Sequence, residues 1–568
     1  MLSIRKIGVI GRTYRHMNRY RQILAALFKY GYEDLVIRLN IDQYLEFGRK
    51  MIRSRPQEAG VRIERMTRAE RVRLILEELG PTFVKFGQIL ATRPDLIPVD
   101  LVNEFARLQD EVPPFGKSEV RRVITQELGK PPEELFASFD PVPVAAASIG
   151  QVHRATLHDG EPVAVKVQRP GIARTIEIDL EIMLHMATLA ERHVAELAPH
   201  RPVRIVEEFA RTIEREIDFS IEAGNMRRMA RLFLDDDTVF IPSVYHDYSS
   251  GRVLTCEYVS GIKISKIDEL DAAGLDRRLI TRRGADLVLK QVFVHGFFHA
   301  DPHPGNLFVL PGNVICLLDF GMTGTIDRQT REDFVDLVDA VVHRHEARAT
   351  RVLLRITDWD QEPDRRHLER DVADFIGLHL YKPLKEIELG PLLNRLLELA
   401  SQHRLRIPPP IFMMMKALSA VENVARRLNP DFDIFEQARP FIVHVKAARY
   451  KPSRITGDLL NIGSVLMEFS HQFPRDLLEL ARLARQERLV LRVEPLGLDR
   501  ILATHDQTSN RIAFAVIIAA LLIGSALIVI SNTPPLIWGI SAIGLAGFLI
   551  ALVLGLWLLV AILRKGSL

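Results

Sequence analysis

Two short polar segments near the middle of the chain constrain its fold more than any other feature. The first reads His-Ala-Asp-Pro-His-Pro-Gly-Asn at residues 299–306, and the second reads Leu-Asp-Phe-Gly at residues 318–321. Asp301 and Asn306 are five positions apart, and Asp319 follows thirteen positions later. Carboxylate and amide oxygens are suited to a hard divalent cation and the phosphates that it neutralises. We therefore expect these three side chains to meet in one cleft.

The order Asp-x-x-x-x-Asn followed by Asp-Phe-Gly is that of the phosphoryl-transfer apparatus of the protein-kinase fold. In that apparatus Asp301 would orient the attacking oxygen, while Asn306 and Asp319 would hold Mg²⁺ against ATP. A plain loop of turn-forming residues is one alternative, but the combined spacing argues against it. A metal-hydrolase cluster of His299, Asp301 and His303 is a second alternative, which leaves Asn306 and Asp319 unexplained.

A kinase-like site also requires a lysine on an upstream strand, and residues 162–167 contain one. They read Pro-Val-Ala-Val-Lys-Val, and Gly160 and Pro170 bound this β-branched run. Lys166 would contact the α- and β-phosphates of ATP and be steadied by a glutamate on a helix. The alternative is a solvent-exposed lysine on an edge strand.

An alanine-rich segment precedes this strand and is a candidate phosphate-binding loop. Small residues let the backbone approach phosphate closely, and alanine is stiffer than the glycine of ordinary kinases. A helical segment is the alternative. A later strand and hinge, with Glu257 and Val259, would bind adenine through backbone groups. The candidate loop consists of Val144, Ala145, Ala146, Ala147, Ser148, Ile149, Gly150, Gln151 and Val152.

Acidic residues at 211–225 offer partners for a lysine. If this segment is one helix, Asp218 and Glu222 share a face at i, i+4, where like charges repel. The arrangement becomes favourable if a cation lies between them, and Lys166 is a natural candidate. A solvated acidic face balanced by nearby arginines is the alternative.

One further motif makes a resemblance specific. The segment Phe-Val-Lys-Phe-Gly-Gln at 83–88, together with the motifs above, resembles the Lys-x-Gly-Gln motif of the UbiB/AarF family of atypical kinase-like proteins, which is linked to ubiquinone biosynthesis. In that family an N-terminal helical extension carries the motif across the mouth of the active site. The resemblance covers nearly the whole chain and implies that Lys85 pairs with Glu216 and Lys166 with Glu222. The implied lid residues are Lys85, Gln88, Glu216 and Asp218.

The chain departs from ordinary protein kinases in two ways. Ala300 replaces the arginine of His-Arg-Asp, so no arginine there can grip a phosphorylated activation loop. The segment after Gly321 is short and lacks Ala-Pro-Glu, which leaves little platform for a protein substrate. The resemblance agrees, because the family is more similar to ATPases acting with small lipid-like molecules than to general protein kinases.

Composition excludes other classes of function. The chain has 75 basic and 72 acidic residues, a near balance that argues against a dedicated nucleic-acid binder. Its two cysteines, Cys256 and Cys316, imply no disulfide framework and a reducing compartment. We expect both to be small core residues of the kinase-like lobes.

Two uncharged apolar segments near the C-terminus predict membrane-spanning helices. Residues 512–530 and 537–563 each reach the length of about 20 residues that a bilayer core requires. The short turn between them predicts a helical hairpin, with buried soluble helices as the alternative. Positive charge flanks both outer ends but not the turn, which predicts a body on the cytoplasmic side of a bacterial inner membrane. Small residues at Gly547, Ala551 and Gly555 would allow close packing within the hairpin or between two copies.

Two basic segments suggest contact with a membrane surface. Arginines and lysines precede Glu33, which favours a retained basic helix near the membrane, with a mitochondrial presequence as the alternative. Residues 474–491 predict an amphipathic basic helix on anionic lipids. An ordinary soluble helix is the alternative for this second segment.

These observations predict an α+β, bilobal protein-kinase-like fold with an N-terminal helical extension and a C-terminal transmembrane hairpin. The predicted parts are a basic helical region (1–65), a helical extension with Lys-x-Gly-Gln (66–135), an N-lobe (136–260), a C-lobe (261–450), amphipathic juxtamembrane helices (451–510) and two transmembrane helices (511–565).

The predicted function is a membrane-anchored ATPase or small-molecule kinase that uses ATP and Mg²⁺ and supports isoprenoid quinone synthesis. Predicted partners are anionic membrane lipids, prenylated quinone precursors and other quinone-biosynthesis proteins, with no nucleic acid. One alternative is a nucleotide- and lipid-binding scaffold that organises such proteins. The other is a Ser/Thr protein kinase.

Overall fold

The chain divides into two compact units, residues 1–456 and 457–568. The predicted basic segment before residue 17 lies outside the described residues, as does nearly all of the predicted helix at 474–491. The computed structural model describes residues 17–39, 66–93, 96–108, 112–194, 201–359, 362–379, 387–449, 498–531, 534–537 and 540–564, with single positions at 467, 469, 473 and 478.

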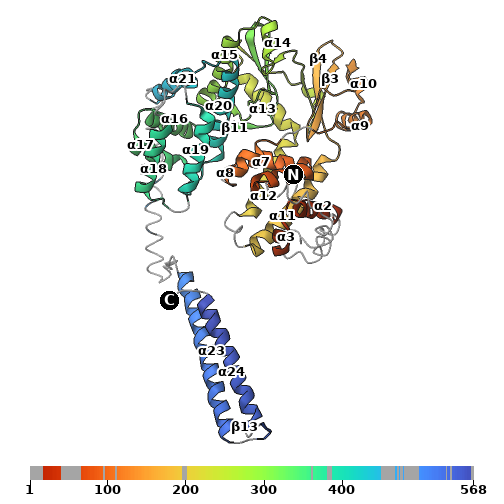
Figure 1. Ribbon diagram of the computed structural model, residues 1–568. Helices are drawn as coiled ribbons and strands as arrows, with labels where there is room; N and C mark the ends of the chain where they lie inside the picture. The colour runs from red at the N-terminus through yellow and green to blue at the C-terminus, as the bar shows by residue number, and fades with distance from the viewer. Residues whose placement is uncertain are drawn as a thin grey trace. The chain divides into compact units, whose positions relative to one another are not determined.

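An N-terminal group of helices packs around its own apolar core. Thr67 caps one of them by accepting a hydrogen bond from the Glu70 amide, while the Glu70 carboxylate accepts one from the Thr67 amide. The order Thr-Arg-Ala-Glu at 67–70 predicts such a capping box, and the structure confirms it. Gly80, at φ 91°, then separates this helix from the next, which begins at Pro81. The group comprises α2 (Met17–Lys29), α3 (Glu33–Arg38), α6 (Arg68–Leu79), α7 (Pro81–Leu90), α8 (Val99–Phe105), α11 (Ile172–His193) and α12 (Pro202–Glu216) (Figure 1).

A five-stranded antiparallel sheet follows, in the order β1-β3-β4-β6, with β2 beside β3. Val163, Val165 and Val167 are fully buried and pack with residues of α9 (Lys117–Leu128). Because successive side chains of a strand point to opposite faces, Lys166 lies on the face away from these valines. The strands are β1 (Ser138–Phe139), β2 (Ala145–Ala146), β3 (Gly150–Thr156), β4 (Pro162–Gln168) and β6 (Val253–Glu257), and α10 (Pro132–Leu135) lies beside α9.

The remainder of the first unit is mostly helical around two small sheets. One sheet has the order β5-β10-β9-β7, with β5 parallel to β10, and the other is the ribbon of β8 with β11. The strands are β5 (Val239–Phe240), β7 (Ile262–Lys263), β8 (Phe297–His299), β9 (Leu307–Leu310), β10 (Val314–Leu317) and β11 (Thr323–Thr325). The helices are α13 (Phe219–Leu232), α14 (Ile267–Ala272), α15 (Arg277–Leu289), α16 (Arg328–Val342), α17 (Glu346–Ile356), α18 (Arg365–His379), α19 (Leu389–Gln402), α20 (Pro409–Leu428) and α21 (Ile434–Ala448).

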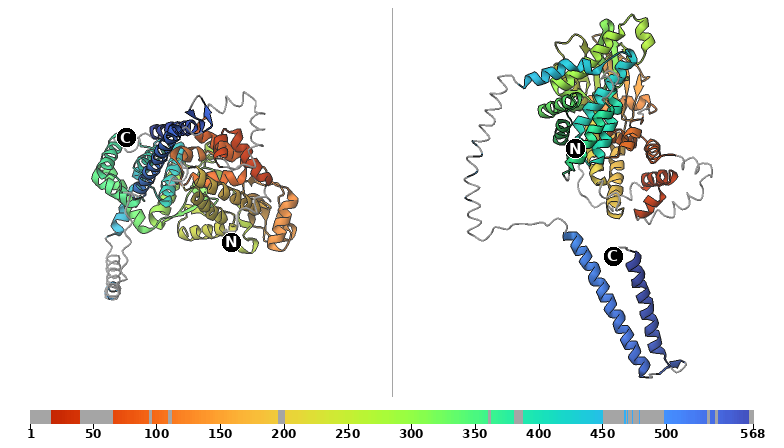
Figure 2. Two further views of the ribbon diagram at one scale, coloured as in Figure 1. Left: turned by 90° about the horizontal axis from the view of Figure 1, so that it is seen from below. Right: turned by 60° about the vertical axis from the view of Figure 1, so that its left-hand side comes forward.

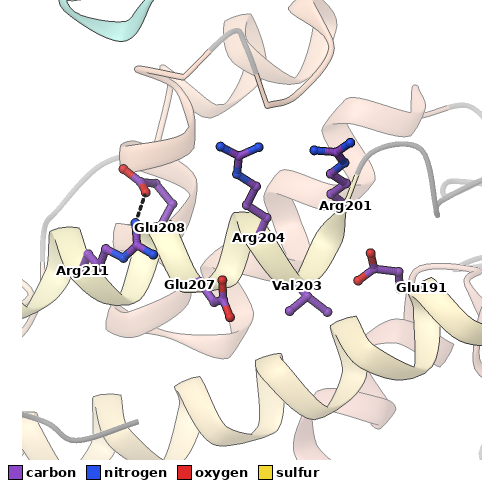
Figure 3. A pocket seen from close by; sticks show the side chains of 7 residues that line it. All are labelled: Glu191, Arg201, Val203, Arg204, Glu207, Glu208 and Arg211. Atoms are coloured by element: carbon purple, nitrogen blue, oxygen red, sulfur yellow. Dashed lines mark hydrogen bonds and ion pairs between the residues drawn. The ribbon is translucent and has the colours of Figure 1, made fainter. Parts of the chain in front are cut away.

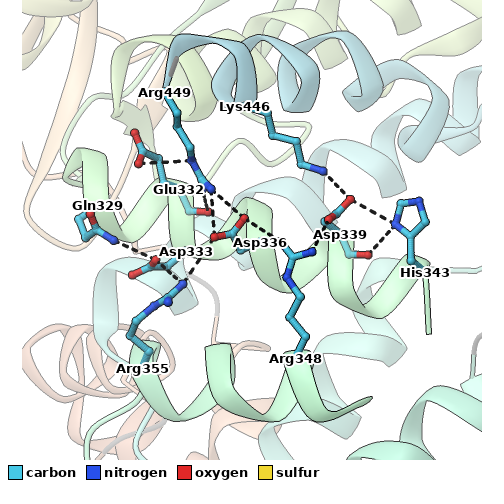
Figure 4. A network of polar contacts seen from close by, with 10 residues as sticks. All are labelled: Gln329, Glu332, Asp333, Asp336, Asp339, His343, Arg348, Arg355, Lys446 and Arg449. Atoms are coloured by element: carbon cyan, nitrogen blue, oxygen red, sulfur yellow. Dashed lines mark hydrogen bonds and ion pairs between the residues drawn. The ribbon is translucent and has the colours of Figure 1, made fainter. Parts of the chain in front are cut away.

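A network of acids on α16 and cations from its neighbours fastens α21 and α17 to α16 (Figure 4). Arg449, which follows α21, donates to Asp336 Oδ1 at 2.9 Å and to the Glu332 carbonyl at 2.6 Å. Arg348 of α17 lies 3.4 Å from Asp336 and 3.2 Å from Asp339. Since these carboxylates are largely buried, the network restrains the helices more than exposed pairs would.

The second unit contains two long helices that run side by side, α23 (Leu498–Ile530) and α24 (Ala542–Arg564) (Figure 2). Among the described residues, Ile512–Ile530 is the one helical segment long and apolar enough to cross a membrane. The apolar part of α24 is the shorter segment Ala542–Leu558.

The predicted start of the second apolar helix is wrong. Residues 536–541 include a strand pair, β12 (Leu536–Ile537) and β13 (Ile540–Ser541), and the helix begins only at Ala542. Two consecutive prolines precede this segment and Gly539 lies within it, and these residues favour a turn over a helix.

Small residues of α24 lie against α23, as expected for packing within the hairpin. A Cβ added at Gly547 would meet the Ser525 hydroxyl, and one at Gly544 would lie 2.5 Å from Val529. Ala551 is buried, whereas a Cβ at Gly555 would enter open space. The contact surface therefore includes Gly544, which was not predicted, and excludes Gly555, which was.

Candidate functional site

The face of β4 that bears Lys166 lies against α13, and the two elements bring a buried ion pair together. The Lys166 ammonium lies 3.0 and 2.8 Å from the two carboxylate oxygens of Glu222. It also lies 5.1 Å from the ring centroid of Phe219. Burial alone would lower the pKa of Lys166, but the carboxylates of Glu222 and Asp319 raise the pKa above its ordinary value. Lys166 is therefore a fixed cation rather than an exposed edge-strand lysine.

A second ion pair joins α7 to α12. Lys85 contacts Glu216, and both side chains are almost buried, at 11% and 9% exposure. The two helices are also held by an edge-to-face contact between Phe86 and Phe209, whose centroids are 4.9 Å apart. Gln88, one turn along α7, donates to the Leu108 carbonyl at 3.2 Å. Both ion pairs implied by the family resemblance are thus formed, and their roles in function stay predictions.

Residues 211–225 do not form the single helix that a shared face of Asp218 and Glu222 would require. The segment breaks into α12 and α13, and Asp218 caps the second helix by accepting a hydrogen bond from the Ser220 amide at 3.0 Å. Aspartate is favoured at such a cap because its carboxylate satisfies a free backbone N–H group. Asp218 therefore does not share a helical face with Glu222, and no cation is needed between them. The lid role of Asp218 remains a prediction.

The catalytic-loop motif is anchored by a buried histidine. His299 accepts a hydrogen bond at Nδ1 from the Asp301 amide, so its Nε2 carries the proton and donates to the Asp319 carbonyl. The His299 amide in turn donates to Gln291 Oε1 at 2.9 Å. Both ring nitrogens are occupied, which argues against His299 as a metal ligand. Among the described residues, the His and Asp groups able to surround a metal ion lie elsewhere, at His367, Asp371 and His403.

Asp319 is held in an unusual backbone conformation beside this histidine. Its φ is 59°, and its Oδ1 accepts a hydrogen bond from the Gly321 amide at 3.1 Å. Burial opposes ionisation, but Lys166, this amide, His299 and Lys85 together lower the pKa of Asp319 to about 2. A non-glycine residue at positive φ is uncommon, and aspartate adopts this region more readily than most residues.

Asn306 is hydrogen-bonded on both sides. Its backbone bonds to Leu318, which precedes Asp319, and its side chain bonds to Asp301. Its carbonyl accepts from the Leu318 amide at 2.9 Å, and its Nδ2 donates to the Asp301 carbonyl at 3.4 Å. This hydrogen bond uses the Nδ2 of Asn306 and leaves its amide oxygen available. Together with the ionised Asp319 carboxylate, that oxygen would supply hard ligands for a cation. This donor set fits Mg²⁺, which prefers oxygen ligands and keeps several waters.

The alanine-rich segment forms a tight turn between β2 and β3 rather than a helix. The Ala147 amide donates to the Gly150 carbonyl at 2.8 Å and closes the turn. A Cβ added at Gly150 would lie 2.7 Å from the Val167 carbonyl, so only glycine permits this approach to β4. The Ser148 hydroxyl is buried and has no hydrogen-bond partner within the described residues. The turn therefore presents an unsatisfied polar group next to the strand of Lys166.

The predicted adenine-binding segment follows β6. The Glu257 amide is occupied, because it donates to the Ser243 carbonyl at 2.9 Å. Val259 lies two residues later, beyond the end of the strand, and is half-buried. Tyr258, between them, stacks under the Arg154 guanidinium at 4.8 Å from its ring centroid. Of the two predicted positions, Val259 therefore retains the freer backbone for a ligand.

Sequence reasoning missed two residues that the structure brings to the site. Asn225 of α13 donates to the Phe320 carbonyl at 3.0 Å and so connects the helix of Glu222 to Asp-Phe-Gly. Lys416 of α20 lies 3.6 Å from Asp301 Oδ1. The run Phe-Met-Met-Met-Lys at 412–416 by itself predicts helical core rather than a cofactor-binding segment. Its one signal of a site is a charged residue inside an apolar stretch.

Two hollows of the first unit lie apart from these residues. One has a volume of about 350 Å³ and lies along α12, where the guanidinium groups of Arg201 and Arg204 extend to the same side (Figure 3). Arg211 and Glu208 of the same helix pair at 3.3 Å there. The other is an apolar cavity of about 130 Å³ among the C-terminal helices, with Phe334 in its wall.

The lysine–glutamate pair, the paired Asp and Asn of the catalytic loop and the constrained Asp-Phe-Gly define a kinase-like protein. Comparisons with known families agree. Residues 107–353 match the ABC1 atypical kinase-like domain, residues 372–433 the UbiB helical domain, and residues 496–564 the ABC1/UbiB kinase-like C-terminal domain.

Relatives extend this agreement along the chain. A protein named "Probable protein kinase UbiB" from Marinobacter nauticus is 36% identical over 72% of this chain and 76% of its own length. The "Uncharacterized protein in hydrogenase 1 5'region" of Clostridium pasteurianum is 32% identical over 88% of this chain and 94% of its own length. The "Uncharacterized protein sll1770" of a Synechocystis strain is 39% identical over 67% of this chain and 65% of its own length. The chain belongs to the UbiB/ABC1 family of atypical kinase-like proteins.

Proposed function

We propose that this protein binds ATP with Mg²⁺ and transfers the γ-phosphoryl group to water or to a small lipid-like acceptor. The observation that carries the proposal is the convergence of distant charges. Lys166 and Glu222 pair at 2.8 Å, and the charge of Asp319 raises the pKa of Lys166, although more than 150 residues separate Lys166 from Asp319. Asp301 and Asn306 are joined to Asp319 through His299 and the Leu318 amide.

Each residue has a separate task in this reaction. Lys166 holds the α- and β-phosphates, while Asn306 and Asp319 are the Mg²⁺ ligands. When bound, Mg²⁺ neutralises charge on the β- and γ-phosphates. Asp301 orients the acceptor hydroxyl, whose oxygen bonds to the γ-phosphorus as the bond to the bridging oxygen breaks. The electron pair of that bond stays on ADP, and the acceptor proton passes to Asp301 and then to solvent.

The extension supports a small acceptor over a protein. The Lys85–Glu216 pair fixes α7 on α12, and the charge of Lys85 reaches Lys166 and Asp319 closely enough to shift the pKa of each. A helix held so near the phosphate site leaves little room for an extended polypeptide. We therefore infer that α7 closes the site against protein substrates and that Lys85→Ala changes nucleotide affinity.

The second unit supports attachment to a membrane. The segment Ile512–Ile530 exposes large apolar side chains along most of its length, and α24 does the same. Exposed apolar helices of this length need a lipid environment. We propose that the pair forms a hairpin in the bacterial inner membrane, with the kinase-like body on the cytoplasmic side. Family membership then favours a prenylated quinone precursor as the small molecule and ubiquinone synthesis as the pathway.

The decisive experiment measures ATP turnover by the full chain in anionic liposomes, with and without a phenolic quinone-precursor analogue. Asp319→Asn should abolish turnover, whereas Asp431→Asn, at an exposed aspartate outside the site, should leave it unchanged. If the wild type binds ATP but its turnover does not exceed that of Asp319→Asn, the protein is a nucleotide-binding scaffold and not an enzyme. Phosphate transferred to an added protein would instead support a Ser/Thr protein kinase.

A further inference from the structure

Helix α20 packs against β11, the strand paired with the one that leads into the catalytic loop. It also packs against α15. Strand β11 pairs with β8, with Thr323 opposite His299. Met414 and Ala417 of α20 are fully buried and belong to the core of the C-terminal helices. The backbone of Lys416, which lies between them, is therefore held in a defined place relative to Asp301.

The side chain of Lys416 reaches the half-exposed carboxylate of Asp301. Its Nζ lies 3.6 Å from Asp301 Oδ1, while His303 Nε2 lies 4.0 Å from Oδ2. Lys416 is 30% exposed and Asp301 34% exposed, so both groups are open to a ligand. A separation of 3.6 Å is longer than a strong charge-assisted hydrogen bond of about 2.8 Å. The flexible lysine stem can therefore give up this contact for a better one.

The site has a need for such a cation. Residues 299–306 contain no lysine or arginine, and Ala300 precedes Asp301. Lys166 is committed to Glu222 on the side of Asp319. During phosphoryl transfer, negative charge spreads over the equatorial oxygens of the moving group, and a fixed cation there lowers the barrier. Near Asp301, Lys416 is placed to supply that charge.

We propose that Lys416 binds the γ-phosphoryl group of ATP during its transfer. This inference rests on the proposed function and adds a catalytic residue from the UbiB helical domain to the kinase-like site. In the nucleotide-free protein the ammonium rests against Asp301. When ATP is bound, it turns to a γ-phosphate oxygen and leaves Asp301 free to orient the acceptor. The bonds made and broken are those of the transfer given above, and Lys416 exchanges no proton.

The test compares Lys416→Met with Lys416→Arg and with Arg427→Met, which removes an exposed cation from the same helix. Equilibrium binding of ATP and ADP is measured beside turnover. For Lys416→Met we expect kcat to fall by about 100-fold, in the range seen on loss of one transition-state donor. ATP affinity should weaken several-fold while ADP affinity stays the same. Lys416→Arg should recover part of both losses, and Arg427→Met should match the wild type.

The outcomes separate this inference from the proposed function. Unchanged kcat and an unchanged preference for ATP over ADP in Lys416→Met would overturn the role of Lys416 while leaving the enzyme intact. Equal weakening of ATP and ADP with a lower melting temperature would make Lys416 structural and would also overturn it. A wild type without turnover, whose preference for ATP is lost in Lys416→Met, would support the contact with the γ-phosphate and reject the proposed reaction.

Discussion

Substitution of Glu222 alone would break its buried ion pair with Lys166, and the structure sets the expected loss of folding stability. In Glu222→Gln, Lys166 keeps its charge but loses a partner that contacts it through both carboxylate oxygens. Removing one member of a buried pair costs about 3–5 kcal/mol. Asp319 also stabilises this ammonium, so we expect the lower end, about 3 kcal/mol. In a unit of this size, this loss of stability would lower the melting temperature by at most about 6 °C.

The matched double variant tests whether the ion pair stabilises the folded protein more than two apolar residues would. Replacing both members of a buried ion pair by apolar residues is often neutral or stabilising. We therefore expect Lys166→Met/Glu222→Leu to be more stable than Glu222→Gln but less stable than the wild type, because the buried Asp319 carboxylate also loses Lys166. Glu78→Gln is the control, because its pair with Lys29 is exposed and should contribute less than about 1 kcal/mol.

Urea unfolding of the full chain in detergent, followed by Trp359 fluorescence after Trp538→Phe and Trp557→Phe, reports on the first unit alone. The pKa of Lys166 is raised in the folded state, so its contribution is complete below about pH 10 and is lost only as pH rises through the folded value. The difference between Glu222→Gln and the wild type should accordingly be flat from about pH 7 to about pH 9. Stability equal to wild type in Glu222→Gln, or no recovery in the double variant, would refute the reasoning.

Three further predictions concern other parts of the first unit. Gly87→Ala should destabilise the protein by about 1–3 kcal/mol in thermal melts, because the added Cβ meets the buried Leu108 side chain; a wild-type melting temperature would contradict this. Thr67→Ala should lower the free energy of unfolding by about 1 kcal/mol through loss of the capping box, and Thr67→Ser should restore it. Burial raises the pKa of Cys256 and of Cys316 to about 12, so a thiol reagent at pH 8 should label neither before unfolding and both after it; rapid labelling of the native protein would show that a thiol is exposed.

The motifs were predictable because each is short and carries its chemistry in local spacing. Asp301, Asn306 and Asp319 were expected in one cleft from their order alone, and the structure links them through His299 and the backbone. Valine recurs at every second position from Val163 to Val167, so strand geometry places Lys166 on the face opposite these valines. The capping box at Thr67 was equally local, since four consecutive residues contain all of its hydrogen bonds.

The partners of isolated charges could not be predicted in the same way. Asp218 would share a helical face with Glu222 only in one continuous helix, but the chain turns there and the carboxylate caps the following helix. The sequence around Lys416 predicts apolar helical core and contains no signal of a contact with Asp301, which lies 115 residues earlier. Packing of α20 against β11 decides that contact, and packing has no periodic signature in the sequence.

Taken alone, the order of residues determined the kinase-like class and the apolar C-terminal helices, since spacing and hydrophobic period are local properties. It also predicts which oxygen atoms would bind Mg²⁺. Tertiary structure decided which cation faces which carboxylate, where α12 gives way to α13, and where α24 begins. These outcomes depend on burial, which strengthens a charge pair only after distant elements have excluded water from it.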